Sequence, residues 1–342
     1  MQAIRFHEHG GPEVLRFEAA PDPVAGCGEV VVRVRACALN HLDLFVRAGI
    51  PGARIPMPHI PGSDVAGEIA ALGEGVRDLA VGQKVVLSPG VSCGHCAACD
   101  ACQENFCRHY TVLGYALDGG CAQYVKAPAE NALPMPPNLD FVEAAAVPLV
   151  FLTAWHMLVA RAGLRPGQDV LVLAASSGVG SAAVQIAKLF HCRVFATAGG
   201  ERKLELARQL GADYVFDHYR ETFAAEVKKI ASRGVDVVVE HVGQATWEQS
   251  VRALASGGTL VTCGATSGHQ ATLDLRHLFA RQLRFVGSYM GSRSELRELL
   301  PFVASGQLRP VVDRVFPLAE ATAAHRYLEE KQQFGKVVLS VS

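Results

Sequence analysis

The sequence predicts an α/β protein with two domains, one rich in β-strands and one built on a doubly wound parallel sheet. Three observations support this prediction. The chain has 342 residues, half of them hydrophobic, which is too long for one comfortable core. Residues 1–125 combine short β-branched runs with turn signals. From Asp169 onward, strands alternate regularly with helices.

The first part of the chain has the pattern of an irregular β-rich lobe. Val30–Val34 and Lys84–Leu87 are short runs rich in valine, a β-branched residue that favours strands. Pro51-Gly52 and Pro61-Gly62 are turn signals between such runs. We therefore expect short strands joined by tight turns.

The second part alternates buried strands with helices. The run Val170–Leu173 is continuously apolar, as expected for a strand covered on both faces, and helical spacing follows over Val179–Phe190. This alternation specifies a parallel sheet with right-handed crossovers. The further expected elements are strand Arg193–Thr197, helix Glu201–Leu210, strand Tyr214–Phe216, helix Phe223–Ile230, strand Val235–Val239, strand Thr259–Cys263 and a last strand at Leu283–Gly287. Strand and helix pieces without a Gly-rich loop follow, through Val337–Leu339.

A loop of small residues, Ala174-Ala175-Ser176-Ser177-Gly178-Val179-Gly180, joins the first of these strands to its helix. Small side chains let the backbone approach a pyrophosphate at the helix N-terminus, where free N–H groups favour negative charge. A Gly-rich turn alone is often only a tight connection, but the strand before it and the helix after it provide the context of a dinucleotide site. The loop therefore predicts cofactor binding by Ser177, Gly178, Val179 and Gly180.

The end of the second strand indicates which cofactor binds. NAD enzymes place a carboxylate there to hold the ribose 2′-hydroxyl, whereas this sequence has Ala198 followed by two glycines. Arg202 and Lys203 supply cations that can pair with a 2′-phosphate. Alternatively, both are exposed residues of a first helical turn, where cations are mildly unfavourable. We predict NADP(H).

Five of the ten cysteines fall within fifteen residues. Cys93, Cys96, Cys99 and Cys107 supply four thiolates, enough to close a tetrahedral zinc shell that leaves no position for water. We therefore predict one structural Zn²⁺ per chain. The fifth cysteine, Cys102, either replaces Cys99 as a ligand or is a free thiol.

The charge balance limits the partners. The formal net charge is −1, so no basic stripe is expected to bind nucleic acid or anionic lipid. No apolar run reaches the length of a membrane span, and Met1–Gly10 lacks the apolar core of a signal peptide. We expect a cytoplasmic enzyme that acts on small molecules, with neither nucleic acid nor a membrane as partner.

Several segments together resemble the medium-chain dehydrogenase/reductase superfamily over nearly the whole chain. They are the four-cysteine lobe, the Gly-rich loop, Gly62-Ser63-Asp64-Val65-Ala66-Gly67, Val81-Gly82-Gln83-Lys84-Val85, Ala144-Ala145-Ala146-Val147-Pro148 and Leu152-Thr153-Ala154-Trp155. The resemblance implies a GroES-like catalytic domain over 1–148 and 287–342, with its zinc lobe at 90–110. It also implies a Rossmann domain over 149–286, a cofactor between the two, and a homodimer or homotetramer. The full set of candidate cofactor-binding residues is Thr153, Ser177, Gly178, Val179, Gly180, Arg202, Lys203, Tyr219 and Gly264.

The zinc alcohol dehydrogenases of this superfamily hold a catalytic metal with a Cys after an early strand, a Gly-His-Glu motif, and a Cys or acid before the Rossmann domain. The corresponding positions here are Asn40, Ser63 and Leu149. Because all three ligands are missing, we expect no open zinc site. A site rearranged around Cys37, His41 and Asp64 is the less favoured alternative, since the alternation of its strand directs Cys37 into the core.

The missing catalytic ligands make the chain similar to the quinone-oxidoreductase and enoyl-reductase branches, which mostly reduce activated double bonds. Many quinone oxidoreductases carry a Tyr five residues after the Asn, where this chain has Phe45. Related reductases place an Asn or His beside the nicotinamide at a strand end, which corresponds to His241. Asn40 and His241 are therefore the candidate catalytic residues, with a cap for helix His41–Arg47 and a satisfied strand-end histidine as their structural alternatives. His156 is expected to be a packed helix residue.

The expected reaction is hydride transfer from C4 of NADPH to an electron-poor carbon of a quinone, enone or enoyl-thioester. Hydrogen bonds must then polarise the carbonyl, because no Lewis acid is expected. One alternative is an alcohol dehydrogenase or carbonyl reductase. A second, of another class, is a non-catalytic NADPH-binding protein similar to the crystallin-like members of the superfamily.

Overall fold

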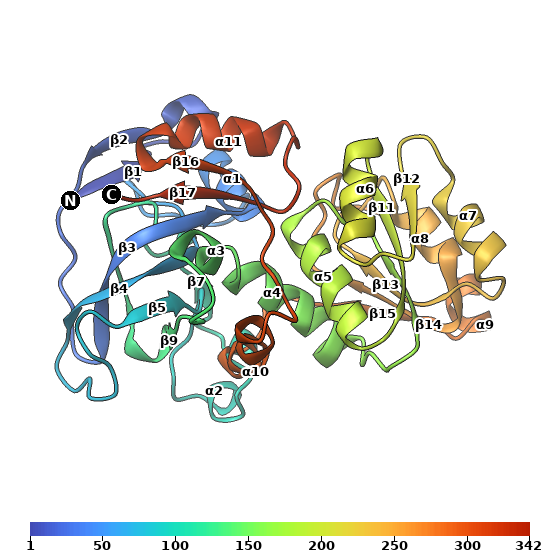
Figure 1. Cartoon of the computed structure of the whole chain (residues 1–342), viewed down its shortest axis with the longest axis horizontal. Coiled ribbons are helices and arrows are strands. Elements are labelled where there is room, and N and C mark those ends of the chain that lie inside the picture. Colours follow the sequence, from blue (N-terminus) through green and yellow to red (C-terminus); the bar gives the residue numbers. More distant parts are fainter. The chain divides into compact units, whose positions relative to one another are not determined.

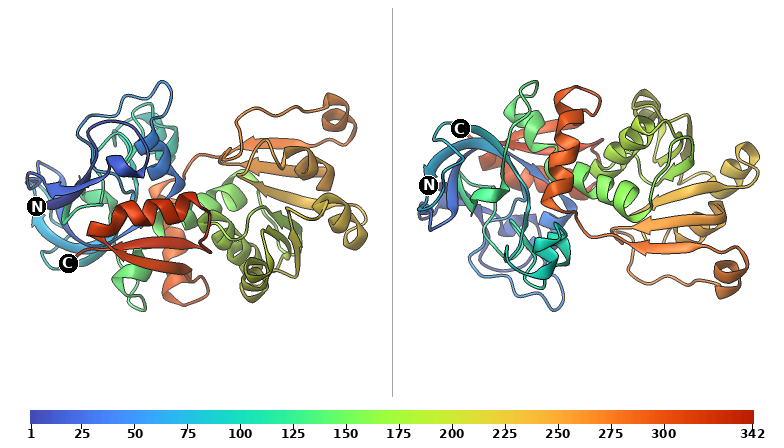
Figure 2. Two further views of the ribbon diagram at one scale, coloured as in Figure 1. Left: turned by 90° about the horizontal axis from the view of Figure 1, so that it is seen from above. Right: turned by 90° about the horizontal axis from the view of Figure 1, so that it is seen from below.

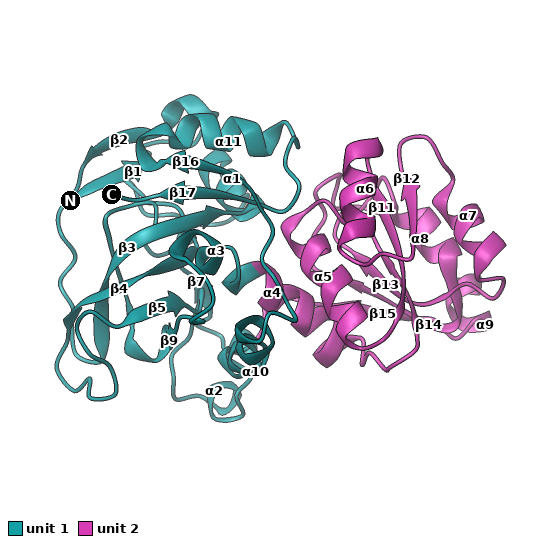
Figure 3. Cartoon of the chain, viewed as in Figure 1, with its two compact units in different colours: residues 1–149, 292–342 teal, residues 150–291 magenta.

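The computed structural model describes residues 1–342, which divide into two compact units (Figure 3). Unit 1 comprises Met1–Leu149 and Ser292–Ser342, and unit 2 comprises Val150–Gly291. Both chain termini therefore lie in unit 1 (Figure 1). None of the helices combines the length and apolar character required to cross a bilayer.

Unit 1 is built on a seven-stranded sheet in the order β16-β17-β3-β4-β5-β9, with β8 also pairing with β3. Its strands are β3 (Glu29–Leu39), β4 (Asp64–Leu72), β5 (Lys84–Leu87), β8 (Tyr124–Pro128), β9 (Ala132–Pro134), β16 (Val312–Pro317) and β17 (Lys336–Ser340). Two small sheets pair β1 (Gln2–Arg5) with β2 (Arg16–Ala19) and β6 (Gly90–Val91) with β7 (Thr111–Val112). The predicted strands Val30–Val34 and Lys84–Leu87 are confirmed as parts of β3 and β5.

Unit 1 also contains several helices. They are α1 (His41–Ala48), α2 (Ala97–Asp100), α3 (Phe141–Ala145), α10 (Arg293–Ala304) and α11 (Ala321–Glu329). Figure 2 shows α11 lying along the two C-terminal strands, and its apolar side chains join one core with valines of β3 and β17. The C-terminal segment thus completes the sheet that the N-terminal residues begin.

Unit 2 is a six-stranded parallel sheet in the order β12-β11-β10-β13-β14-β15. Its strands are β10 (Asp169–Val172), β11 (Arg193–Ala198), β12 (Tyr214–Asp217), β13 (Val235–Glu240), β14 (Leu254–Thr262) and β15 (Arg284–Gly287). The order reverses between β10 and β13, and in such sheets ligands bind at the carboxyl ends of the strands beside the reversal. The predicted doubly wound sheet is therefore confirmed.

The helices of unit 2 connect these strands. They are α5 (Gly178–Leu189), α6 (Glu201–Gln209), α7 (Phe223–Ile230), α8 (Trp247–Ala253) and α9 (Leu275–Ala280). Right-handed crossovers place α5 and α6 on one face of the sheet and α7 and α8 on the other. α4 (Pro148–Trp155) begins at the boundary of the units and continues as a π-helical segment over His156–Arg161. Two short helices, α8 with seven residues and α9 with six, were not predicted from the sequence.

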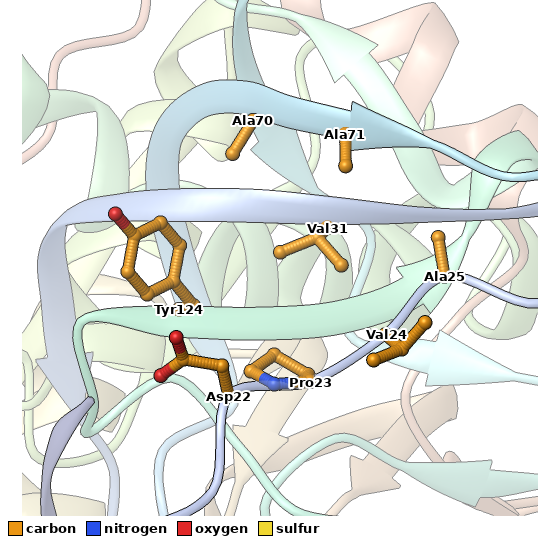
Figure 4. A pocket seen from close by; sticks show the side chains of 8 residues that line it. All are labelled: Asp22, Pro23, Val24, Ala25, Val31, Ala70, Ala71 and Tyr124. Carbon is orange, nitrogen blue, oxygen red and sulfur yellow. The ribbon is translucent and has the colours of Figure 1, made fainter.

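A hollow of about 360 Å³ in unit 1 lies away from the predicted site residues. Figure 4 shows the side chains that line it, from the segment after β2 and from strands β3, β4 and β8: Asp22, Pro23, Val24, Ala25, Val31, Ala70, Ala71 and Tyr124. Most of these side chains are small or apolar, and the sequence analysis singled out none of them.

Candidate active site

The carboxylate of Asp64, at the start of β4, is the centre of a buried hydrogen-bond network in unit 1. Its Oδ1 accepts the backbone N–H of Leu149 at 2.7 Å. Its Oδ2 accepts Nδ2 of Asn40 at 2.9 Å and Nζ of Lys336 at 2.8 Å. Nζ of Lys336 also donates to Oδ1 of Asn40 at 2.6 Å. The network joins two of the three positions compared with zinc ligands, Asn40 and Leu149, to a lysine that the sequence analysis did not single out.

Figure 1 shows that β17, β3 and β4 are neighbouring strands, and their register brings these side chains together. β17 runs antiparallel to β3 with Val337 opposite Leu39, so Lys336 comes next to Asn40. β4 runs antiparallel to β3 with Asp64 opposite Ala38. The three polar residues therefore sit at the same end of adjacent strands.

Asn40 is also the N-cap residue of α1, which is the structural role that its place in the sequence suggested. It occupies the position before the first helical residue, and Oδ2 of Asp43 accepts its backbone N–H at 2.7 Å. Oδ1 of Asp43 accepts the N–H of Gly62 at 2.9 Å. Burial raises the pKa of Asp43 to about 6, against the lowering effects of these N–H donors and of Lys336. The side chain of Asn40 thus belongs to the network while its backbone starts the helix.

The raised pKa of Asp43 predicts a pH-dependent stability. An increase from 3.8 to about 6 makes ionisation in the folded state less favourable by about 3 kcal/mol. The stabilising contribution of the protonated carboxyl is present below pH 3.8 and is lost as the pH rises through about 6. The free energy of unfolding in urea should therefore fall for the wild type relative to Asp43→Asn as the pH rises from 4 to 7. A difference independent of pH over this range would contradict the assignment.

Gly62 fits a position that a larger residue cannot fill. Its φ is +105°, and a Cβ there would lie 2.6 Å from Sγ of Cys37 and 2.7 Å from Sγ of Cys121. These two sulfurs are 3.8 Å apart, and both cysteines are fully buried. The prediction that Cys37 packs in the core is confirmed. The neighbouring Ser63 is also buried, and its Oγ has no hydrogen-bond partner.

In unit 2, the Gly-rich loop has the geometry of a tight strand-to-helix connection. Ser177 precedes α5, and its Oγ accepts the N–H of Gly180 at 2.9 Å. A Cβ on Gly180 would lie 2.3 Å from the carbonyl oxygen of Ala174, so only glycine allows this close approach. The predicted residues Gly178 and Val179 form the first turn of α5. Free N–H groups of this turn are the feature that binds phosphate in such loops.

The tip of β11 carries no acidic side chain. Ala198 is fully buried and pairs in register with Asp217 of β12. The carboxylate of Asp217 is occupied by backbone N–H groups, those of Gly200 at 3.2 Å and Tyr219 at 2.9 Å. The exposed ring of Tyr219 lies against Gly199, where a Cβ would be 2.4 Å from the ring.

Arg202 and Lys203 lie in the first turn of α6, directly after this tip. The two cations and the ring of Tyr219 therefore lie at the end of the sheet where β11 and β12 finish. The carboxylate of Asp217 is engaged by backbone N–H groups, and the only acid in the first turn of α6 is the exposed Glu201.

His241 follows β13 and is held against the loop after β10. Its Nε2 lies 2.8 Å from the carbonyl oxygen of Leu173, which can only accept, so Nε2 carries the proton. Oγ of Ser177 lies 3.5 Å from the same nitrogen. Burial holds the pKa of His241 below its usual value, so the imidazole is neutral at pH 7. Gly264 lies against the backbone of His241, where a Cβ would be 3.2 Å from its carbonyl oxygen.

Glu240, which the sequence analysis did not single out, anchors the segment after His241. It is fully buried, and its carboxylate accepts from the backbone N–H groups of Val242 and Gly243. The hydroxyls of Thr246 and Ser250 also donate to it. These four hydrogen bonds fix the backbone of the loop that follows His241.

Loss of this anchor should destabilise the protein. Glu240→Ala leaves three buried donors and one partly buried donor without their acceptor, so we expect the free energy of unfolding to fall by about 3 kcal/mol. Denaturant unfolding followed by fluorescence provides the measurement. Glu248→Ala, which removes an exposed carboxylate paired with Arg252, serves as control and should change stability by less than about 0.5 kcal/mol. Equal effects of the two substitutions would show that the anchor is not needed.

Thr153 and His156, at the start of unit 2, were predicted to be a cofactor-binding residue and a packed helix residue. Oγ1 of Thr153, on α4, is buried without a hydrogen-bond partner. His156 is buried in the helical segment, and its predicted packed position is confirmed. Phe45, on α1 of unit 1, is 46% exposed and provides no hydroxyl.

The four cysteines predicted to bind zinc converge in one cluster. The Sγ atoms of Cys93, Cys96, Cys99 and Cys107 all lie within 4.8 Å of one another. The distances are 3.9 Å for Cys93 to Cys99, 3.6 Å for Cys96 to Cys99 and 3.5 Å for Cys107 to Cys93. A tetrahedral Zn²⁺ with four bonds of about 2.3 Å needs sulfurs about 3.8 Å apart. Cys102 is exposed and is not part of the cluster, so Cys99 and not Cys102 completes the set.

Known protein families and relatives match this chain over most of its length. Residues 26–137 match the family of the alcohol dehydrogenase GroES-like domain, and residues 178–305 match that of the zinc-binding dehydrogenases. An alcohol dehydrogenase of Geobacillus stearothermophilus is 33% identical over 96% of each chain, and a quinone oxidoreductase of Sus scrofa is 29% identical over 99% of this chain and 97% of its own. A crystal structure of an NAD-dependent alcohol dehydrogenase is 48% identical, with a TM-score of 0.97 and full coverage of both chains. The chain is therefore an oxidoreductase that belongs to the medium-chain dehydrogenase/reductase superfamily.

Proposed function

We propose that this chain is an NADP(H)-dependent reductase that transfers hydride to an activated double bond, without a catalytic zinc. The substrate class is a quinone, an enone or an enoyl-thioester. The observation that carries the proposal is the Lys336 ammonium, held between Asn40 and Asp64 at 2.6 and 2.8 Å.

These residues do not fit a catalytic zinc. Leu149 offers no side-chain ligand, and its N–H already occupies one oxygen of Asp64. The other oxygen of Asp64 is bonded to the Lys336 ammonium, whose positive charge repels a second cation. Zinc sites use thiolate, imidazole or carboxylate ligands, and only Asp64 of this set is one of these.

The expected chemistry follows from the residues that are present. Bound NADPH supplies a hydride from C4, and a proton must reach the substrate to balance the reduction. Asn40 contributes a fixed amide in unit 1, and His241 contributes a neutral imidazole in unit 2, suited to orienting a ligand and not to carrying charge. Polarisation of the substrate carbonyl by hydrogen bonds needs a donor other than Asn40 and His241, because the N–H groups of both side chains already bond to protein oxygens.

The proposal of NADP(H) rests on the tip of β11. Ala198 places no carboxylate at this tip to repel a 2′-phosphate, and Arg202 and Lys203 supply the charge to hold the phosphate. Thr153, Ser177, Gly178, Val179, Gly180, Tyr219 and Gly264 complete the proposed cofactor-binding set. We further propose that Cys93, Cys96, Cys99 and Cys107 would hold one Zn²⁺, which supplies structure to their loop and takes no part in the reaction.

A substrate screen tests this function. Quinones, enones, enoyl-thioesters and aldehydes are offered with NADPH, and consumption is followed at the nicotinamide absorbance. We expect turnover with at least one class of activated double bond. Cofactor binding without turnover of any substrate would instead support the non-catalytic NADPH-binding alternative.

A second candidate is an alcohol dehydrogenase or carbonyl reductase, favoured by the names of the similar proteins. Oxidation of primary and secondary alcohols with NAD⁺ and NADP⁺ tests it directly. Alcohol oxidation that exceeds enone and quinone reduction would replace the first proposal with this one.

A further inference from the structure

We propose that Lys336 is the positioning residue of this site and that it acts through Asn40, whose amide orientation it sets. The inference rests on the proposed function in one respect, the role of Asn40 as a catalytic residue. Lys336 itself is 3% exposed, and its Nζ is already bonded to Asn40 and Asp64.

The chemistry of the two neighbours allows only one orientation of the Asn40 amide. An amide can be rotated by 180° with little change of shape, which exchanges its oxygen and nitrogen. Lysine only donates and an ionised carboxylate only accepts. Oδ1 of Asn40 must therefore face Lys336, and Nδ2 must face Asp64, as the distances of 2.6 and 2.9 Å have it.

The Lys336 ammonium is fixed by an ion pair with Asp64. Asp64 is fully buried, so its charge requires a counter-ion, and Lys336 supplies it at 2.8 Å. Asp43 is the second buried carboxylate of the cluster, and its oxygens accept from the backbone of Asn40 and Gly62. Lys336 is the only positive charge among these three groups.

The orientation determines what Asn40 offers to a ligand. One N–H of Nδ2 is taken by Asp64, and the other points to the carbonyl oxygen of Ala38 at 3.4 Å. Oδ1 retains one lone pair after accepting from Lys336. Asn40 is thus set to accept a hydrogen bond, for example from a hydroxyl or amide of cofactor or substrate.

A double-mutant cycle tests the role of Lys336. Lys336→Met and Asn40→Ala should each lower kcat by about 10- to 100-fold, the loss typical of a partner that orients a functional group. The double variant should be no slower than Asn40→Ala, because Lys336 acts only through this amide. Lys336→Arg, which keeps the charge and the donors, should recover part of the lost kcat. Lys126→Met, a half-exposed lysine of β8, is the control and should leave kcat unchanged.

Lys336→Met leaves Asp64 buried without its counter-ion, so the cycle is repeated with Asp64→Asn in every variant. Multiplicative losses in both backgrounds, or full kcat in Lys336→Met, would overturn the proposal. The cycle uses whichever nicotinamide-dependent activity the screen identifies. Alcohol oxidation would therefore defeat the proposed function while still deciding the role of Lys336. For a protein without turnover, the Kd for NADPH takes the place of kcat: coupled losses support the proposal and independent losses reject it.

Discussion

Replacing Lys203 or Arg202 with alanine is expected to raise the Michaelis constant for NADPH by about 10- to 100-fold. A hydrogen bond to a charged group contributes about 1.5–3 kcal/mol, and each 1.4 kcal/mol is a factor of ten. The constant for NADH should stay within about twofold, because NADH has no 2′-phosphate for these cations to bind. Steady-state kinetics with both cofactors provide the measurement.

Ala198→Asp tests the same site by adding a negative charge instead of removing a positive one. Ala198→Asp places a carboxylate at the tip of β11, where it repels a 2′-phosphate and can accept from a ribose hydroxyl. We expect it to reverse the preference from NADPH to NADH. Lys228→Ala, on α7 in the same unit, controls for a general loss of positive charge. Equal affinity of the wild type for both cofactors would reject the assignment of NADP(H).

Cys96→Ser is expected to lower the melting temperature by about 5–10 °C and to expose residues 100–108 to proteases. The loop from Gly90 to Tyr110 has few apolar residues, so without its metal it buries too little surface to offset the entropy of ordering. The folded fraction should keep its Michaelis constant for NADPH, because the proposed cofactor-binding residues lie in unit 2. Thermal scanning measures the melting temperature, limited proteolysis measures the exposure of residues 100–108, and steady-state kinetics give the Michaelis constant.

Cys102→Ser is the matched control for this experiment. Cys102 lies in the same loop but is exposed and outside the cluster, so its loss should leave both stability and zinc content unchanged. A zinc-depleted enzyme that stayed folded but could not transfer hydride, and recovered at once with zinc, would show that the metal takes part in the reaction.

The fold of unit 2 was predictable because its signals are local. Each strand from β10 to β13 is a short apolar run, and the intervening helices show helical spacing, so the sequence alone predicted elements such as Phe223–Ile230 correctly. The exceptions are α8 and α9, which were not predicted. Both are short, and Trp247, Ser250 and Val251 of α8 are only moderate helix formers.

The candidate site was only partly predictable, because its partners are far apart in the chain. Asn40 stood out by resemblance, but Lys336 lies 296 residues later and reaches it only through the register of β17 against β3. A single sequence does not contain this register. Glu240 was missed for another reason: its partners are backbone N–H groups and hydroxyls, which leave no motif.

The zinc content of the active enzyme tests the central claim most directly. One intact set of four cysteines, and a network at Asp64 already occupied by Lys336, predict one zinc per chain. Elemental analysis of purified, active wild type should therefore give one zinc, absent from Cys96→Ser. Asp64→Ala should leave this number unchanged. Two zincs per chain, with one lost together with activity in Asp64→Ala, would contradict a reductase that works without a catalytic metal.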